Sequence, residues 1–240
     1  MRHFKQVFSE VIDFEVIDAP FECPAEPPRE LQRFLAEDRT HFRSWLKFSE
    51  WNQEVGLSPD VVYGLEEVVD YLVGVLRTQG PFDGVLAFSQ GGIIFRHFYR
   101  ITQEIEPEAF ARPDNQAKQV FQMPRFLMSC SSPVFDMRFR YKGELYTQRR
   151  TQQFNFPSLH MHGTQDEFKK NLVSHTLFTE DSNPQVIEFE AGHRFPRELS
   201  KDGFLKLKNF VREQFIAKNG NDDEFECEYN DYNFQVRIAK

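Results

Sequence analysis

The stretch PFDGVLAFSQGGIIF, residues 81–95, constrains the fold of this chain more than any other segment. It has the pattern of a short apolar strand over 83–88 that ends at Ser89 and is followed by a helix over about 91–103. A serine at such a turn is either a catalytic nucleophile or a residue that caps the next helix. A serine nucleophile needs a base to take its proton and an acid to orient that base, so the first hypothesis requires both partners elsewhere in the chain.

Strand patterns alternate with helix patterns along most of the sequence. Apolar residues recur every three or four positions between Ser58-Pro59, which suit a helix start, and Gly80, which suits its end. Further helices are expected around 167–179 and 199–217. The apolar runs typical of buried strands are 125–130, 158–161 and 186–189. This alternation predicts an α/β fold with a mostly parallel sheet and helices on both faces.

Both ends of the chain depart from the alternating pattern. A short strand is expected at 14–18, and residues 20–57 are rich in prolines, charges and aromatic side chains, which we interpret as an excursion over the mouth of a site. The acidic stretch 219–224 marks the end of the domain. We therefore expect a domain at 1–217 and an acidic, aromatic tail at 218–240, which could form a hairpin or be disordered.

Charge and cysteine content narrow the class of protein. The chain has 29 Lys and Arg against 37 Asp and Glu, a net charge of −8, which argues against binding to nucleic acid or to an anionic membrane surface. No apolar run reaches the ~18 residues that a membrane helix needs. Three cysteines without zinc spacing indicate neither a disulfide framework nor a structural metal site. We expect a soluble, cytoplasmic protein that acts on a small or neutral partner, and the oligomeric state is left open.

The neighbours of Ser89 meet the steric demand of a nucleophile turn. Such a turn imposes strained backbone angles, so the residues two before and two after the serine must be small. Ala87 and Gly91 are small, although glycine is the usual residue at the first of these positions. The pattern alone does not decide between a nucleophile and a helix cap.

Two partners for Ser89 follow later strands. Asp166 comes just after the second of the later strand runs, and His193 comes in the loop after the third. In a parallel sheet the loops at the carboxyl ends of the strands converge, and the order Ser, Asp, His is one that such folds use. Asp166 could instead cap a following helix, and His193 could be a surface residue. Asp181 is an alternative acid, but it follows a helix pattern rather than a strand.

Four motifs together resemble those of the small serine hydrolase family known from fungi, plants and animals, which belongs to the α/β-hydrolase superfamily. The motifs are DAPF at 18–21, PFDGVLAFSQGG at 81–92, HGTQD at 162–166 and AGHRFP at 191–196. The family includes esterases and thioesterases. The resemblance implies an α/β-hydrolase-like fold and cleavage of a small-molecule ester or thioester, without a cofactor or metal.

The resemblance also implies a role for each site residue. Ser89 would be the nucleophile that forms an acyl-enzyme, His193 its base and Asp166 the group that orients the base. The backbone N–H of Gln90 would be one oxyanion donor.

One feature of the family is missing from the sequence. The family pattern opens with a strand that ends in a His-Gly loop, whose backbone N–H supplies the second oxyanion donor. That strand would lie between the strands expected at 14–18 and 83–88. We therefore expect an N-terminally truncated hydrolase fold: either Met1 is an internal methionine of a longer protein, or the chain is a poor enzyme.

Two rival functions are kept. The first is a non-catalytic protein with the hydrolase fold that binds a ligand or a partner. The second is a metallohydrolase built on His160, His162 and Asp166, although no third cluster of ligands is apparent in the sequence.

Two groups of residues outside the motifs have two interpretations each. A set of arginines could meet an anionic part of a substrate or form a solvated face. The aromatic residues of 34–51 could line an acyl pocket or form a packed lid. The arginines are Arg138, Arg140, Arg149 and Arg150.

Overall fold

The computed structural model describes residues 12–23, 42–46, 61–111, 121–149, 151–219, 227–228 and 235–236. The helix start expected at Ser58-Pro59 lies outside these residues, as does most of the segment 20–57.

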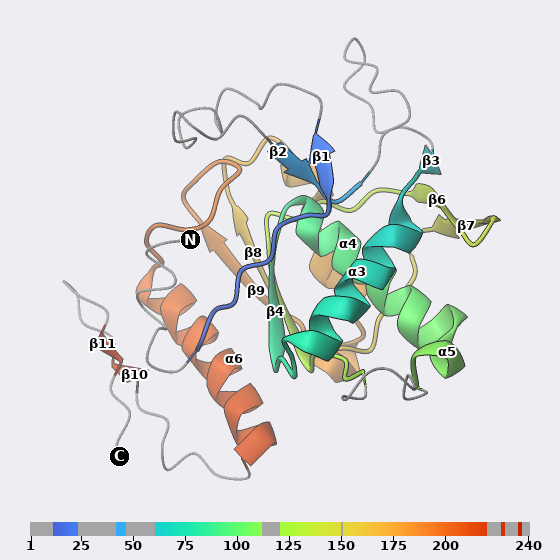
Figure 1. The fold of residues 1–240 in the computed structure, drawn as a ribbon. Helices are drawn as coiled ribbons and strands as arrows, with labels where there is room; N and C mark the ends of the chain where they lie inside the picture. The colour runs from blue at the N-terminus through green and yellow to red at the C-terminus, as the bar shows by residue number, and fades with distance from the viewer. Residues whose placement is uncertain are drawn as a thin grey trace.

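A four-stranded parallel sheet forms the centre of the described chain (Figure 1). Its strands follow the order β4-β5-β8-β9, and every neighbouring pair is parallel. All four had been expected from their apolar sequences, so the predicted α/β class is confirmed. The strands are β4 (Gly84–Phe88), β5 (Phe126–Cys130), β8 (Ser158–Gly163) and β9 (Gln185–Phe189).

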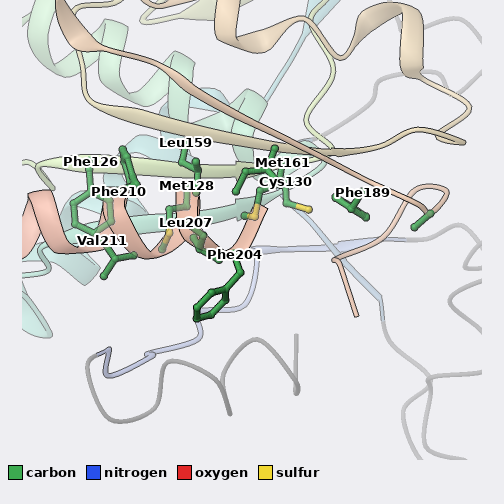
Figure 2. Packing of buried hydrophobic residues seen from close by; sticks show 12 residues of the cluster. Phe126, Met128, Cys130, Leu159, Met161, Phe189, Phe204, Leu207, Phe210 and Val211 are labelled. Atoms are coloured by element: carbon green, nitrogen blue, oxygen red, sulfur yellow. The ribbon is translucent and has the colours of Figure 1, made fainter. Parts of the chain in front are cut away.

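Helices cover both faces of this sheet because successive side chains of a strand point to opposite faces. Helix α6 (Lys201–Asn219) packs Phe204, Leu207 and Phe210 against one face, where Figure 2 shows them beside alternate residues of β5 and β8. Helix α4 (Gln90–Arg100) packs Phe95 against Leu127 on the opposite face. Helix α3 (Leu65–Thr78) lies beside α4, on the far side of the strands from α6 (Figure 1).

Helix α4 has the expected position and continues into a π-helical turn, η1 (Ile101–Ile105), which the short helix α5 (Pro107–Ala111) follows. Helix α3 begins later than expected. Val61–Val62 instead form β3, which pairs with a neighbouring strand, and Gly64 then takes a left-handed conformation, with φ of 78°, immediately before the helix. Because only glycine adopts this conformation at no steric cost, the helix starts after Gly64.

The continuous helix expected at 167–179 is wrong. The segment forms two short 3₁₀ turns instead, η2 (Lys169–Asn171) and η3 (Ser174–Leu177), and a third, η4 (Glu180–Ser182), follows it. Its backbone carbonyls serve other partners: Asn171 O accepts from the N–H of Val134 at 2.8 Å, and Leu177 O accepts from Phe154 at 2.7 Å. These bonds to distant segments hold the backbone in short turns instead of a continuous ladder of i to i+4 bonds.

The strand expected at 14–18 is also wrong, because this segment has no strand structure. The chain pairs only a few residues later, where β1 (Phe21–Cys23) forms an antiparallel ladder with β2 (Phe42–Ser44). The backbone of a strand must form hydrogen bonds with a neighbouring strand. Among the described residues, β4 pairs on one side only, with β5.

A small second sheet was not expected. It has the order β3-β6-β7, where β6 (Met137–Tyr141) and β7 (Glu144–Gln148) form a hairpin. The alternation in MRFRY is the signal that was missed: its three apolar residues are buried while Arg138 and Arg140 are exposed. Arg149 is exposed as well, and Arg150 lies outside the described residues.

The C-terminal segment, for which a hairpin and disorder were the two alternatives, contains an antiparallel pair, β10 (Cys227–Glu228) with β11 (Gln235–Val236). It forms a sheet of its own rather than pairing with β4. The division into a domain at 1–217 and a tail at 218–240 stays a prediction. Among the described residues, no helix has the length and apolar character needed to cross a membrane.

Candidate active site

Ser89 lies on the sharp turn between β4 and α4. Its φ of 50° and ψ of −113° are strained for a residue with a side chain, and such strain costs about 1–3 kcal/mol. The backbone N–H of Ser89 donates to Cys130 O at 2.9 Å, which ties the turn to the neighbouring strand. The Ser89 side chain makes no capping hydrogen bond to α4, so the alternative of a simple helix cap is not supported.

The closest packing at this turn occurs at a glycine whose role was not predicted, Gly92. A Cβ built at Gly91 would lie 3.7 Å from the Cβ of Ala87, an ordinary contact, so the extra methyl of Ala87 is accommodated. A Cβ at Gly92 would lie 2.6 Å from the Cβ of Ser132 and would collide with its hydroxyl. Gly92 therefore lets α4 approach the end of β5 closely.

The three side chains expected to act together meet in one hydrogen-bonded chain. Ser89 Oγ lies 2.9 Å from His193 Nε2, and His193 Nδ1 lies 2.9 Å from Oδ2 and 3.2 Å from Oδ1 of Asp166. The Asp166 side chain is fully buried, with 0% of its surface exposed. Its Oδ1 also accepts from the backbone N–H of Phe168 at 2.9 Å, so Asp166 both contacts the imidazole and fixes the start of its own loop.

Hydrogen bonds between the loops after β8 and β9 set the distance from Asp166 to His193. The backbone N–H of Thr164 donates to Phe189 O, and that of Gln165 donates to Ala191 O, both at 2.9 Å. A Cβ on Gly163 would collide with Ala191 O, so only glycine permits this approach.

Two aromatic rings flank the imidazole of His193. The ring centroids of Phe88 and Phe168 each lie 5.1 Å from that of His193, and Phe88 also stacks on Phe195 at 4.9 Å. Neither neighbour was predicted from the sequence. Their positions directly before Ser89 and two residues after Asp166 are the only sequence signal for this arrangement.

Gln90 begins α4, so its backbone N–H has no acceptor within the helix and lies next to the nucleophile turn. Its side chain has a second contact that was not predicted: Gln90 Oε1 accepts from the backbone N–H of Trp45 at 3.0 Å. This bond holds the end of the β1–β2 hairpin against the start of α4.

The residues of the metallohydrolase hypothesis do not converge. His160 is buried, with Nδ1 2.8 Å from Ser174 Oγ and Nε2 2.9 Å from Ser158 Oγ, so both ring nitrogens are engaged by hydroxyls. Burial, and then the charge of Arg96, lower the pKa of His160 well below its ordinary value. His162 contacts Glu188 at 3.3 Å. In the described part of the chain, no three His, Cys, Asp or Glu side chains gather into a metal site.

Curated relatives of this sequence include esterases. Esterase CG5412 of Drosophila melanogaster is 25% identical over 169 residues, which cover 66% of this chain and 52% of that protein. Esterase OVCA2 of Homo sapiens is 28% identical over 170 residues, which cover 69% of this chain and 66% of that protein. An uncharacterized hydrolase of Schizosaccharomyces pombe is 24% identical over 68% of this chain and 33% of its own length. The chain thus spans about one third to two thirds of these relatives.

Among solved structures, acyl-protein thioesterase 2 of Zea mays is 15% identical, with a TM-score of 0.42 over 71% of this chain and 74% of that one. The sequence pattern of the family described as "Serine hydrolase (FSH1)" matches residues 1–204, a stretch that contains the serine turn and both loops that meet it. The chain therefore belongs to the serine hydrolase (FSH1) family.

Proposed function

We propose that this chain cleaves carboxylic esters or thioesters through an acyl-enzyme on Ser89. The observation that supports this most is the hydrogen-bonded chain from Ser89 Oγ through His193 to the buried carboxylate of Asp166. A binding protein has no need of three such side chains in series, whereas a serine hydroxyl becomes a nucleophile only when a base accepts its proton.

In the proposed reaction, His193 Nε2 takes the proton of Ser89 as Oγ attacks the carbonyl carbon. Collapse of the tetrahedral intermediate expels the alcohol or thiol, which receives this proton from His193. A water molecule then attacks the acyl-enzyme by the same route and releases the carboxylic acid. Asp166 keeps the proton of the neutral imidazole on Nδ1, so that Nε2 can accept another.

The backbone N–H of Gln90 is the proposed oxyanion donor. It is the first N–H of α4, where the helix dipole also favours negative charge. The family resemblance implies a second donor from a His-Gly loop, and loss of one such donor lowers turnover by ~10²–10³.

The segment after β2 is the proposed wall of the acyl pocket. Trp45 is held at the start of α4 by Gln90, and the Trp45 ring lies 6.3 Å from that of Tyr71 on α3. Leu46 is buried in the apolar cluster beneath. An apolar wall beside the nucleophile favours esters of apolar acids over those of charged acids.

We further propose that the reaction needs no cofactor or metal, that the partner is a small molecule rather than nucleic acid or a membrane, and that the protein acts in the cytoplasm. Activity that a chelator abolishes and zinc restores would contradict the first of these points.

A fluorophosphonate probe tests the proposed nucleophile directly. We expect the 240-residue chain to be labelled covalently, and Ser89→Ala to be folded by circular dichroism but unlabelled. Hydrolysis of p-nitrophenyl esters of increasing acyl length should be lost in the same variant. A folded wild-type chain that neither reacts with the probe nor hydrolyses these esters would instead favour the non-catalytic rival.

A further inference from the structure

The side chain of Gln90 makes a contact that a backbone oxyanion donor does not require. Gln90 Oε1 accepts from the backbone N–H of Trp45 at 3.0 Å, although 45 positions separate the two residues in the sequence. Both residues are half-buried. Because a backbone N–H can only donate, it is the oxygen of the Gln90 amide that faces Trp45. Gln90 therefore joins the nucleophile turn, which it follows directly, to the end of the β1–β2 hairpin (Figure 1).

The chain bends sharply at the residue that Gln90 contacts. The β1–β2 ladder ends at Ser44, one residue before Trp45. Beyond the ladder, Ser44 Oγ donates to Leu46 O at 2.9 Å and accepts from the Leu46 N–H at 3.3 Å, which closes a tight bend over residues 44–46. Leu46 is 3% exposed and belongs to the apolar cluster that α3 and α4 share. The bend is thus anchored by the ladder, by Leu46 and by Gln90, and of these anchors Gln90 joins it to the residue after the nucleophile.

The ring of Trp45 lies on the side of α3. Its centroid is 6.3 Å from that of Tyr71, and the two rings are tilted by 53°. Tyr71 is itself held in place, because its hydroxyl donates to Asp18 O at 3.0 Å. A single tilted ring contact leaves Trp45 room to shift, whereas a hydrogen bond fixes both distance and direction. The position of the Trp45 ring relative to Ser89 therefore depends on the Gln90 side chain.

We propose that the side chain of Gln90 is a positioning residue that sets the preference of the enzyme for long, linear apolar acyl chains. It holds the bend at residues 44–46, with the Trp45 ring, beside the acyl group that Ser89 carries, so the inference rests on the proposed function. A long acyl chain gains apolar contact with this wall, whereas an acetyl group is too short to use it. A wall that is already fixed also costs less entropy to bind against than one that must first be ordered.

The selectivity for acyl length tests this role. It is measured as the ratio of kcat/KM for p-nitrophenyl hexanoate to kcat/KM for p-nitrophenyl acetate. Gln90→Met keeps the length of the side chain but removes the amide oxygen, so the ratio should fall about three- to tenfold, the effect of losing one hydrogen bond. The fall should appear mainly as a higher KM for the hexanoate. Gln90→Glu keeps an acceptor oxygen and should retain the wild-type ratio, even though its negative charge beside the oxyanion lowers kcat for both esters.

A double-mutant cycle separates an effect through Trp45 from an effect on the oxyanion donor. If the Gln90 side chain acts through the wall, Gln90→Met should leave the ratio unchanged in a chain that already carries Trp45→Ala. Gln103→Met is the matched control, because Gln103 is exposed on η1 and its amide donates to the neighbouring Thr102 O at 3.2 Å. This control should keep the wild-type ratio.

Hydrogen exchange of the Trp45 N–H, followed by NMR, tests the contact without catalysis. Loss of the acceptor in Gln90→Met should speed this exchange about tenfold. A wild-type chain that the fluorophosphonate probe does not label would overturn the proposed function, and the selectivity with it. A labelled chain would overturn the present proposal alone if Gln90→Met left the ratio or the exchange rate unchanged, or if it lowered the ratio equally in the Trp45→Ala chain.

Discussion

Replacing Asp166 by asparagine should remove nearly all turnover and leave the fold intact. Asp166 Oδ1 accepts from the N–H of Phe168, while the hydrogen-bond partner of Oδ2 among the described residues is His193 Nδ1, at 2.9 Å. An asparagine would keep its oxygen at the Oδ1 position to preserve the bond to Phe168, so its NH₂ group would point at Nδ1. Nδ1 would then have to accept a hydrogen bond, and the imidazole proton would move to Nε2. With a proton already on Nε2, His193 could not take the proton of Ser89.

The wrong tautomer lowers turnover by ~10⁴ in enzymes with this arrangement, which corresponds to about 5 kcal/mol of transition-state free energy. The assay is the steady-state kcat for a p-nitrophenyl ester, together with the rate of fluorophosphonate labelling and the Tm. We expect Tm to change by only a few degrees, because the number of hydrogen bonds is preserved. Asp181→Asn is the matched control, since Asp181 is exposed on η4, and it should retain full activity. A loss in Asp166→Asn of less than tenfold, or an equal loss in Asp181→Asn, would refute the assignment.

Three further predictions follow from the described contacts. Phe168→Leu should lower kcat by about tenfold with little change in KM, because one of the rings that pack against His193 is lost. Phe168→Tyr, which keeps a ring, should retain the wild-type kcat. A change confined to KM would instead indicate that Phe168 contacts the substrate. Gly92→Ala should destabilise the chain by about 1–3 kcal/mol in urea unfolding, while Gly91→Ala, whose Cβ has room, should be nearly neutral; equal stability of the two variants would contradict the packing argument. Folded His97 has a pKa of about 3 against 6.5 for the free side chain, so unfolding takes up a proton between these values. The free energy of unfolding should therefore fall by about 2 kcal/mol from pH 7 to pH 5, and His97→Leu should remove this part of the slope.

The strands of the central sheet could be predicted because each is a short apolar run, and such runs carry a signal that does not depend on distant residues. Only β5 and β8 are buried at every position. The positions of Asp166 and His193 followed from the same signal, since the loops after parallel strands lie at one edge of the sheet. The contact between them could not be read from the sequence. It depends on Gly163, where the absence of a side chain lets one loop approach the carbonyl of Ala191 in the next.

The elements that were wrong depend on partners distant in the sequence. The segment 167–179 has helical periodicity, but Asn171 O and Leu177 O bind the backbone N–H groups of Val134 and Phe154, which no local pattern reveals. The strand expected at 14–18 has suitable residues but lacks strand structure in the described chain. The β6–β7 hairpin did have a local sequence signal, the alternation of MRFRY. In the structure, Lys142 and Gly143 both take positive φ, 49° and 82°, at the turn that follows.

The order of the strands has a consequence for how function would be lost. Ser89 follows β4 and His193 follows β9, and these two strands lie at opposite ends of the described sheet, with β5 and β8 between them. At about 4.8 Å per strand, the backbones from which the two side chains arise are roughly 14 Å apart, and the loop after β9 must reach back across the sheet. The 2.9 Å contact between Ser89 and His193 therefore depends on the twist and spacing of all four strands. Mild denaturant should abolish turnover before it changes the far-ultraviolet circular dichroism. Loss of activity should therefore report a distortion of the sheet that is too small to change the secondary structure.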